Sequence, residues 1–82
     1  MSCYNIMAVL VSHRINNAKE LQEILTKYGC IIKVRLGLHE AGDVCSEEGL
    51  IILQLCGQED EINALADELN KQEGIKAKNM QI

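Results

Sequence analysis

The sequence predicts a two-layer α+β sandwich with the order βαββαβ, in which two helices cover one face of a four-stranded antiparallel sheet. Two segments are apolar on both faces, which is typical of central strands, and two others alternate apolar with charged residues, as edge strands do. Two further segments carry apolar residues at helical spacing. The 82 residues contain no linker-like stretch, so a single domain over 1–82 is expected.

The first strand and helix occupy the N-terminal third of the chain. Residues 4–12 (YNIMAVLVS) are apolar on both faces, which indicates a buried strand. The helix is expected to begin at Asn16 or Asn17, because Asn17 and Glu20 have the spacing of a capping box. Gly29 is expected to end it in the left-handed conformation. The inner face of this helix is predicted to consist of Ala18, Leu21, Ile24, Leu25 and Tyr28.

Two more strands follow, separated by a polar loop. Residues 31–38 alternate, which predicts a half-exposed strand. Residues 39–48 (HEAGDVCSEE) are polar and are expected to form a loop, and residues 50–56 are almost continuously apolar, as in a second central strand. The alternating strand is predicted to place Ile32, Val34, Leu36 and Leu38 on one face and Lys33 and Arg35 on the other.

The second helix and the last strand complete the order. Glu59, Asp60 and Glu61 place negative charge in the first turn of the helix, where the helix dipole favours it. Gly74 is expected to end this helix, and residues 75–82 are the least apolar of the four predicted strands. The inner stripe is predicted to consist of Ile62, Leu65, Ala66 and Leu69.

These elements match the split βαβ arrangement of ferredoxin-like domains, whose sheet order is 4-1-3-2. Both helices then lie on one face and leave the other uncovered, and an uncovered apolar face usually marks an interaction surface. We therefore expect a homodimer or tetramer that buries this face, the alternative being a monomer that tolerates scattered apolar residues there. Depending on register, the residues on the open face are predicted to include Met7, Val9, Leu50 or Ile52.

Composition limits the possible partners. The net charge of −4 disfavours direct nucleic-acid binding, and no apolar run reaches the length that spans a bilayer. The start of the chain lacks the basic region of a signal peptide, so a cytoplasmic location is expected. Four cysteines never approach CxxC spacing, so reduced thiols are expected, with a packing role for Cys3, Cys30 and Cys56.

The turn that leads into the first helix is a candidate ligand site. Free backbone N–H groups and the positive end of the helix dipole favour a small anionic ligand such as a carboxylate or phosphate. The alternative is that Asn16 and Asn17 only cap the helix. The candidate ligand-binding residues are Ser12, His13, Arg14, Asn16, Asn17 and His39.

A metal site is the alternative functional hypothesis. In the predicted topology His13 and His39 lie at the same rim of the sheet, together with the loop that contains Cys45. Nitrogen and sulfur donors of this kind suit zinc or nickel, provided that three or four ligands converge. The alternative is that these histidines are ordinary surface residues, because their spacing is not that of a known metal motif.

Four segments of the chain resemble one family of small stand-alone proteins. They are residues 28–32 (YGCII), 34–38 (VRLGL), 49–53 (GLIIL) and 60–65 (DEINAL), and the family is that of proposed regulators of the iron-only hydrogenase system. These proteins are similar in fold to ACT domains and to the C-terminal regulatory domain of nickel-responsive repressors. The resemblance implies an oligomer with a regulatory or ligand-sensing role, through a small ligand or a regulatory protein partner.

The chain also departs from these relatives. It lacks the glycine-rich ligand loop of amino-acid-binding ACT domains and the DNA-binding half of the nickel repressors. No pairing of a nucleophile with an oriented base can be identified, and the residues indicate no particular cofactor. The sequence as a whole therefore favours a non-enzymatic regulatory module, linked through the resemblance to hydrogenase or metal metabolism.

Overall fold

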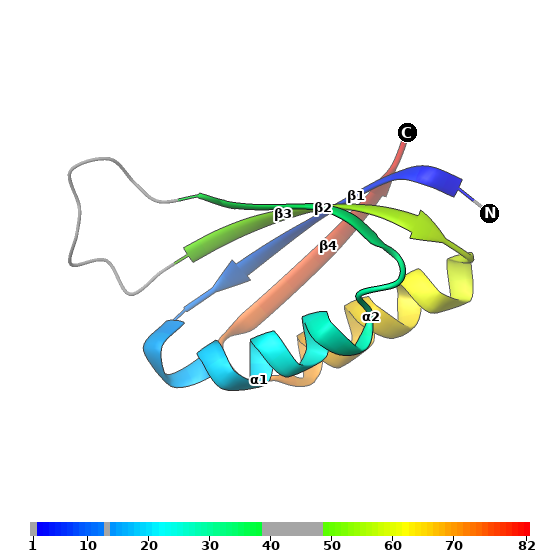
Figure 1. Ribbon diagram of the computed structural model, residues 1–82. Coiled ribbons are helices and arrows are strands. Elements are labelled where there is room, and N and C mark those ends of the chain that lie inside the picture. Colours follow the sequence, from blue (N-terminus) through cyan, green and yellow to red (C-terminus); the bar gives the residue numbers. More distant parts are fainter. Residues whose placement is uncertain (1, 13, 39–48) are drawn as a thin grey trace.

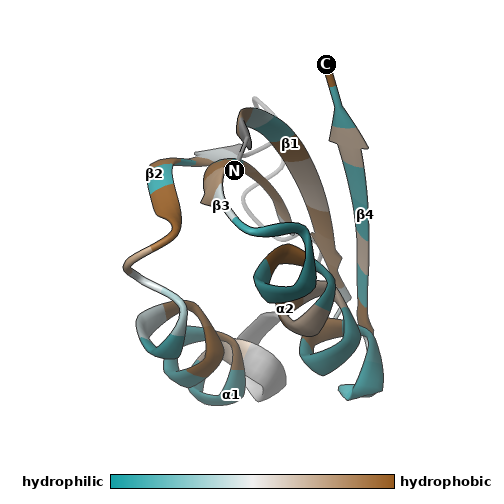
Figure 2. Cartoon of the chain, turned by 90° about the vertical axis from the view of Figure 1, so that its right-hand side faces the viewer, coloured by the Kyte–Doolittle hydropathy of each residue, from teal (hydrophilic) through white to brown (hydrophobic). Residues whose placement is uncertain are grey.

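The computed structural model describes residues 2–12, 14–38 and 49–82. It shows a four-stranded sheet in the order β2-β3-β1-β4, which confirms the predicted topology. Both helices lie side by side on one face of this sheet (Figures 1 and 2). The elements are β1 (Ser2–Val11), α1 (Arg14–Lys27), β2 (Ile32–Leu38), β3 (Gly49–Gly57), α2 (Glu59–Lys71) and β4 (Ile75–Gln81).

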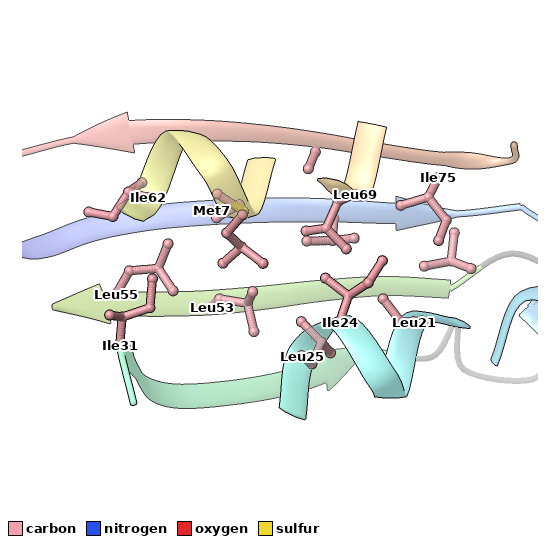
Figure 3. Packing of buried hydrophobic residues seen from close by; sticks show 14 residues of the cluster. Met7, Leu21, Ile24, Leu25, Ile31, Leu53, Leu55, Ile62, Leu69 and Ile75 are labelled. Carbon is pink, nitrogen blue, oxygen red and sulfur yellow. The ribbon is translucent and has the colours of Figure 1, made fainter. Parts of the chain in front are cut away.

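The hydrophobic core lies between the sheet and the two helices (Figure 3). Strand β1 contributes every second residue to it, because successive side chains of a strand point to opposite faces. Met7 and Val9 are fully buried, and Leu53 of β3 lies opposite Met7 across the central strand pair. The helices complete the core with Leu21, Ile24, Leu25, Ile62, Leu65 and Leu69.

This alternation corrects the expected composition of the open face. Met7 and Val9 point toward the helices, whereas Leu50 and Ile52 lie on the opposite face as predicted. Both sequence neighbours of Met7 and of Val9 are also apolar, so the sequence did not distinguish the two faces there. The residues of β1 that lie on the open face are Ile6, Ala8 and Leu10.

The first helix differs from its prediction at both ends. It begins at Arg14, so Asn17 lies inside the first turn and does not cap the helix. Ala18 is exposed and contributes nothing to the inner face. Gly29 lies in the turn after the helix, but Gly74 is the glycine with a positive φ, 83°, within the described residues. Gly74 follows α2 as expected, so the left-handed position belongs to the second helix.

Strand β2 contains an irregularity that changes which side chains share a face. Its pairing with β3 shifts between Ile32 and Val34, so that Ile32 lies opposite Leu55 whereas Val34 lies opposite Gln54. Ile32 therefore packs against the core, and Val34 and Leu36 lie on the open face. The predicted single apolar face of β2 is wrong at Ile32, because a bulge reverses the alternation there.

The edge strand β4 is held by α2 through a side-chain amide. Asn70 donates from Nδ2 to the carbonyl oxygen of Ala77 at 3.0 Å, and the Ala77 N–H donates to Asn70 Oδ1 at 2.8 Å. The two bonds engage the N–H and C=O groups of Ala77, on a strand whose outer side has no neighbouring strand in the sheet. Since unpaired edges invite pairing with other chains, Asn70 protects this edge as well as anchoring the helix.

Gly57 is required for close packing rather than for an unusual backbone angle. A Cβ atom built on it would lie 2.8 Å from Cγ2 of the buried Ile31, closer than such atoms approach. A Cβ atom built on Gly37 of β2 would meet nothing within 4 Å. The two glycines therefore form a matched pair for substitution.

We expect Gly57→Ala to lower the free energy of unfolding by about 1–3 kcal/mol, because the new methyl group overpacks Ile31. Gly37→Ala should leave the free energy unchanged or raise it slightly, since it restricts the unfolded chain without a clash. Urea titration followed by circular dichroism measures both. Equal effects of the two substitutions would contradict this account of Gly57.

Candidate functional site

The structure offers two candidate surfaces, and the first is the open face of the sheet. Strand register defines its members, since directly paired residues share a face. Val34, Leu36 and Met80 are 53%, 52% and 59% exposed. The open face consists of Ile6, Ala8, Leu10, Val34, Leu36, Leu50, Ile52, Gln54, Lys76, Lys78 and Met80.

Charge and apolar area are separated across this face. Strands β2, β3 and β1 contribute almost entirely aliphatic side chains, whereas β4 contributes Lys76 and Lys78 at one edge. A contiguous apolar area over three neighbouring strands is larger than the isolated apolar residues that every protein surface carries. The open face is therefore a contiguous apolar surface with one basic margin, and it is the first candidate for an interaction site.

The second candidate is a cavity on the helix side, where β3 leads into α2. Its volume is about 290 Å³, and carboxamides provide most of its polar side chains. We call it the amide cavity. It is lined by Asn5, Gly57, Gln58, Glu59, Ile62, Asn63, Asn79 and Gln81.

A buried amide pair joins two strands at this cavity. Asn79 donates from Nδ2 to Oδ1 of Asn5 at 3.1 Å, which links β4 to β1. Asn5 is only 3% exposed and is the buried polar residue of the described chain. Burying an amide is costly unless its hydrogen bonds are made, so the partners of Asn5 determine whether this position is tolerated.

The start of α2 supplies the remaining wall. Helix α2 carries acidic residues throughout its first turn, and the Gln58 N–H donates to Oε1 of Glu61 at 3.2 Å. This carboxylate already uses one of the free N–H groups at the helix start. Because the described lining includes the carboxylate of Glu59 and no basic side chain, an anion is disfavoured there.

The ligand site predicted from sequence lies at the other end of the molecule. Strands β1 and β3 are antiparallel, so the helices that follow them begin at opposite ends, as Figure 1 shows. The backbone N–H of Ser12 donates to the carbonyl oxygen of Gly74 at 2.7 Å and is therefore already bonded. Arg14, Asn16 and Asn17 all belong to the first turn of α1.

The remaining candidate residues, His13, His39 and Cys45, lie outside the described residues. Among residues 2–12, 14–38 and 49–82, no group of three or more histidine, cysteine, aspartate or glutamate side chains is arranged to hold a metal ion. The zinc or nickel hypothesis therefore stays a prediction from the sequence.

The cysteines differ from the expected reduced, packed thiols. Cys3 and Cys56 form a disulfide, with their Cα atoms 3.7 Å apart, and Cys30 is free and exposed. The antiparallel pairing of β1 with β3 brings the first two together across 53 residues of sequence. Spacing along the chain carries no signal of such a contact, because only strand register creates it.

A charged cluster joins the two helices. Lys27 at the end of α1 donates to Oε1 of Glu68 at 2.9 Å, and its ammonium group lies 5.6 Å from the centre of the Tyr28 ring. The nearby Tyr28 hydroxyl, and next the Lys27 ammonium, hold the pKa of the Glu68 carboxyl below its ordinary value. The same contacts with Glu68 raise the pKa of Lys27 and of Tyr28. The cluster favours the ionised carboxylate.

We expect Glu68→Gln to lower the melting temperature at neutral pH, by less than Gly57→Ala, since the ion pair is exposed to solvent. A lowered pKa in the folded state stabilises the fold above the ordinary carboxyl pKa. This contribution disappears as the pH falls through the folded-state value.

The difference in melting temperature between wild type and Glu68→Gln should therefore disappear toward about pH 4 and below. Thermal denaturation across a range of pH measures it. Asp67→Asn, which removes the same charge one residue earlier, serves as the control. A difference that widens on acidification would contradict the assignment.

Together these features define a small ferredoxin-like α+β domain with an uncovered apolar sheet face and a polar cavity at one end of its helix layer. Residues 4–79 match the TM1266-like family, described as "Iron-only hydrogenase system regulator, putative". Because the match covers nearly the whole chain, the protein belongs to this family, and the resemblance noted in the sequence is confirmed. No curated protein matches the chain.

Solved structures support the same fold. The uncharacterised protein TM1266 from Thermotoga maritima matches with a TM-score of 0.84 and 23% identity, over 95% of this chain and 94% of that one. A formyltetrahydrofolate deformylase from Pseudomonas putida KT2440 matches with a TM-score of 0.59 and 10% identity, over 95% of this chain and 28% of that one. CPII from Thiomonas intermedia K12, solved with ADP, AMP and acetate, matches with a TM-score of 0.50 and 13% identity, over 100% of this chain and 92% of that one.

Membrane insertion through helices finds no support in the described residues, since neither helix combines the length and apolar character that crossing a bilayer requires.

Proposed function

We propose that this protein is a non-enzymatic regulator in an iron-only hydrogenase system and that it acts as a homodimer formed through the open face. The observation that carries the dimer is the continuous apolar area over β2, β3 and β1, with Leu36 and Val34 more than half exposed. Membership of a family described as a regulator supports the non-enzymatic role. A dimer also offers both copies' remaining surfaces to a regulatory protein partner.

Charge selects one geometry for two sheets packed face to face. A two-fold axis across the strands would place β4 over its own copy, with Lys76 and Lys78 opposite the same lysines. An axis along the strands places β4 over the partner's β2, because the sheet order is β2-β3-β1-β4. The aliphatic stems of the lysines then cover apolar side chains while the ammonium groups reach solvent. The second arrangement avoids like-charge contact.

Solution mass tests the dimer. We expect Ile52→Glu to convert the protein to a monomer in analytical ultracentrifugation, because it buries an unpaired carboxylate near the middle of the interface. Ala18→Glu adds the same charge on the exposed helix side and should leave the dimer intact. A wild-type protein that stays monomeric at micromolar concentration would overturn the proposed dimer.

The position of the charge tests the axis. Leu36 lies at the same level along the sheet as Lys78, because Leu36 pairs with Ile52, Ile52 with Ala8, and Ala8 with Lys78. With the axis along the strands, we expect Leu36→Glu to weaken the dimer much less than Ile52→Glu does, because the new carboxylate faces the partner's Lys78. High salt should remove the advantage of Leu36→Glu, since it screens exposed pairs. Equal dissociation by both substitutions would contradict this axis.

Cells that carry an iron-only hydrogenase test the regulatory role. Deleting the gene should change hydrogenase transcript level or activity, and wild-type protein should restore it whereas Ile52→Glu should not. Unchanged transcript level and activity after deletion would overturn the proposed regulation, whatever the oligomeric state.

A further inference from the structure

The amide cavity has the composition of a recognition site rather than of a gap in packing. Its lining includes five carboxamide side chains, from Asn5, Gln58, Asn63, Asn79 and Gln81, together with one apolar wall from Ile62. Ordinary small-molecule pockets are mostly apolar with a few polar groups, so this lining is unusually rich in paired donors and acceptors. The five carboxamides come from three elements, namely strand β1, strand β4 and the start of α2.

The burial of Asn5 is the strongest feature of this site. Asn5 is only 3% exposed, yet it is one of the residues that line the cavity. Its Oδ1 accepts from Asn79 Nδ2, and this bond leaves the Asn5 Nδ2 group and Asn79 Oδ1 to other partners. One donor and one acceptor, on adjacent strands, are thereby presented side by side.

Charge decides which molecules fit. The N-terminus of α2 alone would attract an anion, but Glu59 lines the cavity and Glu61 already occupies the Gln58 N–H. None of the described residues that line the cavity is a lysine, arginine or histidine. A phosphate or carboxylate ligand would therefore lack a counter-charge and would meet a carboxylate.

We infer that the amide cavity binds a small uncharged molecule whose own N–H and C=O groups pair with side-chain amides, such as a carboxamide or a nucleobase-like ring. Its volume of about 290 Å³ lies at the lower end of ligand-sized cavities. Ile62 is the large apolar side chain among the lining residues, and with 2% exposure it offers a ligand only a small apolar surface, so polar contacts must supply most of the recognition. The carboxamides satisfy the polar edge of such a ligand.

Strand alternation connects the cavity to the open face. Asn79 lies opposite Met7 in the register of β1 with β4, and the neighbouring pair Ile6 and Met80 lies on the other side of the sheet. A ligand that orders Asn5 and Asn79 thus fixes the same strand segments that carry Ile6 and Met80. For this consequence the inference rests on the regulatory function proposed above, whereas ligand binding itself does not.

Matched probes that differ in charge test the inference on the full chain. Side-chain amide signals in ¹H–¹⁵N NMR report directly on Asn5 and Asn79. We expect nicotinamide or uracil to shift these signals, and the anionic counterparts nicotinate and orotate to bind at least about tenfold more weakly. The cationic N1-methylnicotinamide should also bind more weakly than nicotinamide, since the cost of burying its charge is offset only by the exposed carboxylate of Glu59.

Two variants separate recognition from folding. Asn79→Leu removes the partner of the buried Asn5 and should lower stability, but Asn79 is exposed on an edge strand, so the fold should be retained. The substitution should weaken binding of the neutral probe at least about tenfold. Ala64→Glu, on the exposed side of α2, should leave binding unchanged. Folding of each variant is checked by its backbone NMR spectrum.

Three results would overturn the inference. They are no shift of the Asn5 and Asn79 amides by either neutral probe at about 10 mM, tighter binding of the anions, or unchanged affinity in Asn79→Leu. Ultracentrifugation of the same samples separates the two proposals. Loss of binding with an intact dimer overturns the ligand site alone, and binding by a monomeric wild type overturns the dimer alone.

Discussion

The pairing of β1 with both β3 and β4 is the constraint on which the rest of the structure depends. This strand lies inside the sheet, so its alternation determines what each face of the molecule presents. Met7 and Val9 fill the core beneath the helices, and their neighbours Ile6 and Ala8 lie on the uncovered side. A shift of one residue would exchange these sets, which would place Asn5 on the open face and remove it from the amide cavity.

The strand and helix order was predictable from the sequence because it depends on the overall apolar and charged character of each segment. Continuous apolar runs identified the central strands, and the lysines of β4 identified an edge, so the sheet order followed without knowledge of register. The overall apolar character of a strand does not tell which of its residues face the helices. Met7 and Ile6 are both large and aliphatic, and only pairing with Leu53 and the packing of Leu65 and Leu69 decide which of them is buried. The bulge after Ile32 is likewise a property of two strands together.

The candidate site was less predictable for a related reason. Sequence reasoning placed the candidate ligand site at the start of α1, because the free backbone N–H groups and the dipole of a helix start favour an anion. The amide cavity instead gathers Asn5, Gln58 and Asn79, which are separated by dozens of residues and do not titrate. One signal was nevertheless present in the sequence: Asn5 is a polar residue within a strand that is otherwise apolar on both faces. Such a residue in a small core requires a partner, and Asn79 is that partner.

The open face and the amide cavity lie on opposite sides of the sheet. Asn70 occupies the outer backbone groups of Ala77, so the proposed dimer uses the flat face of the sheet rather than the β4 edge. On the opposite side, the helices are joined by Lys27 and Glu68 and cover the core except where β3 enters α2. The cavity at that entry is separated from the open face by a single layer of sheet. In the inference drawn above, a ligand that orders Asn5 and Asn79 acts on Ile6 and Met80 through the backbone of the same two strands, because these residues alternate along β1 and β4.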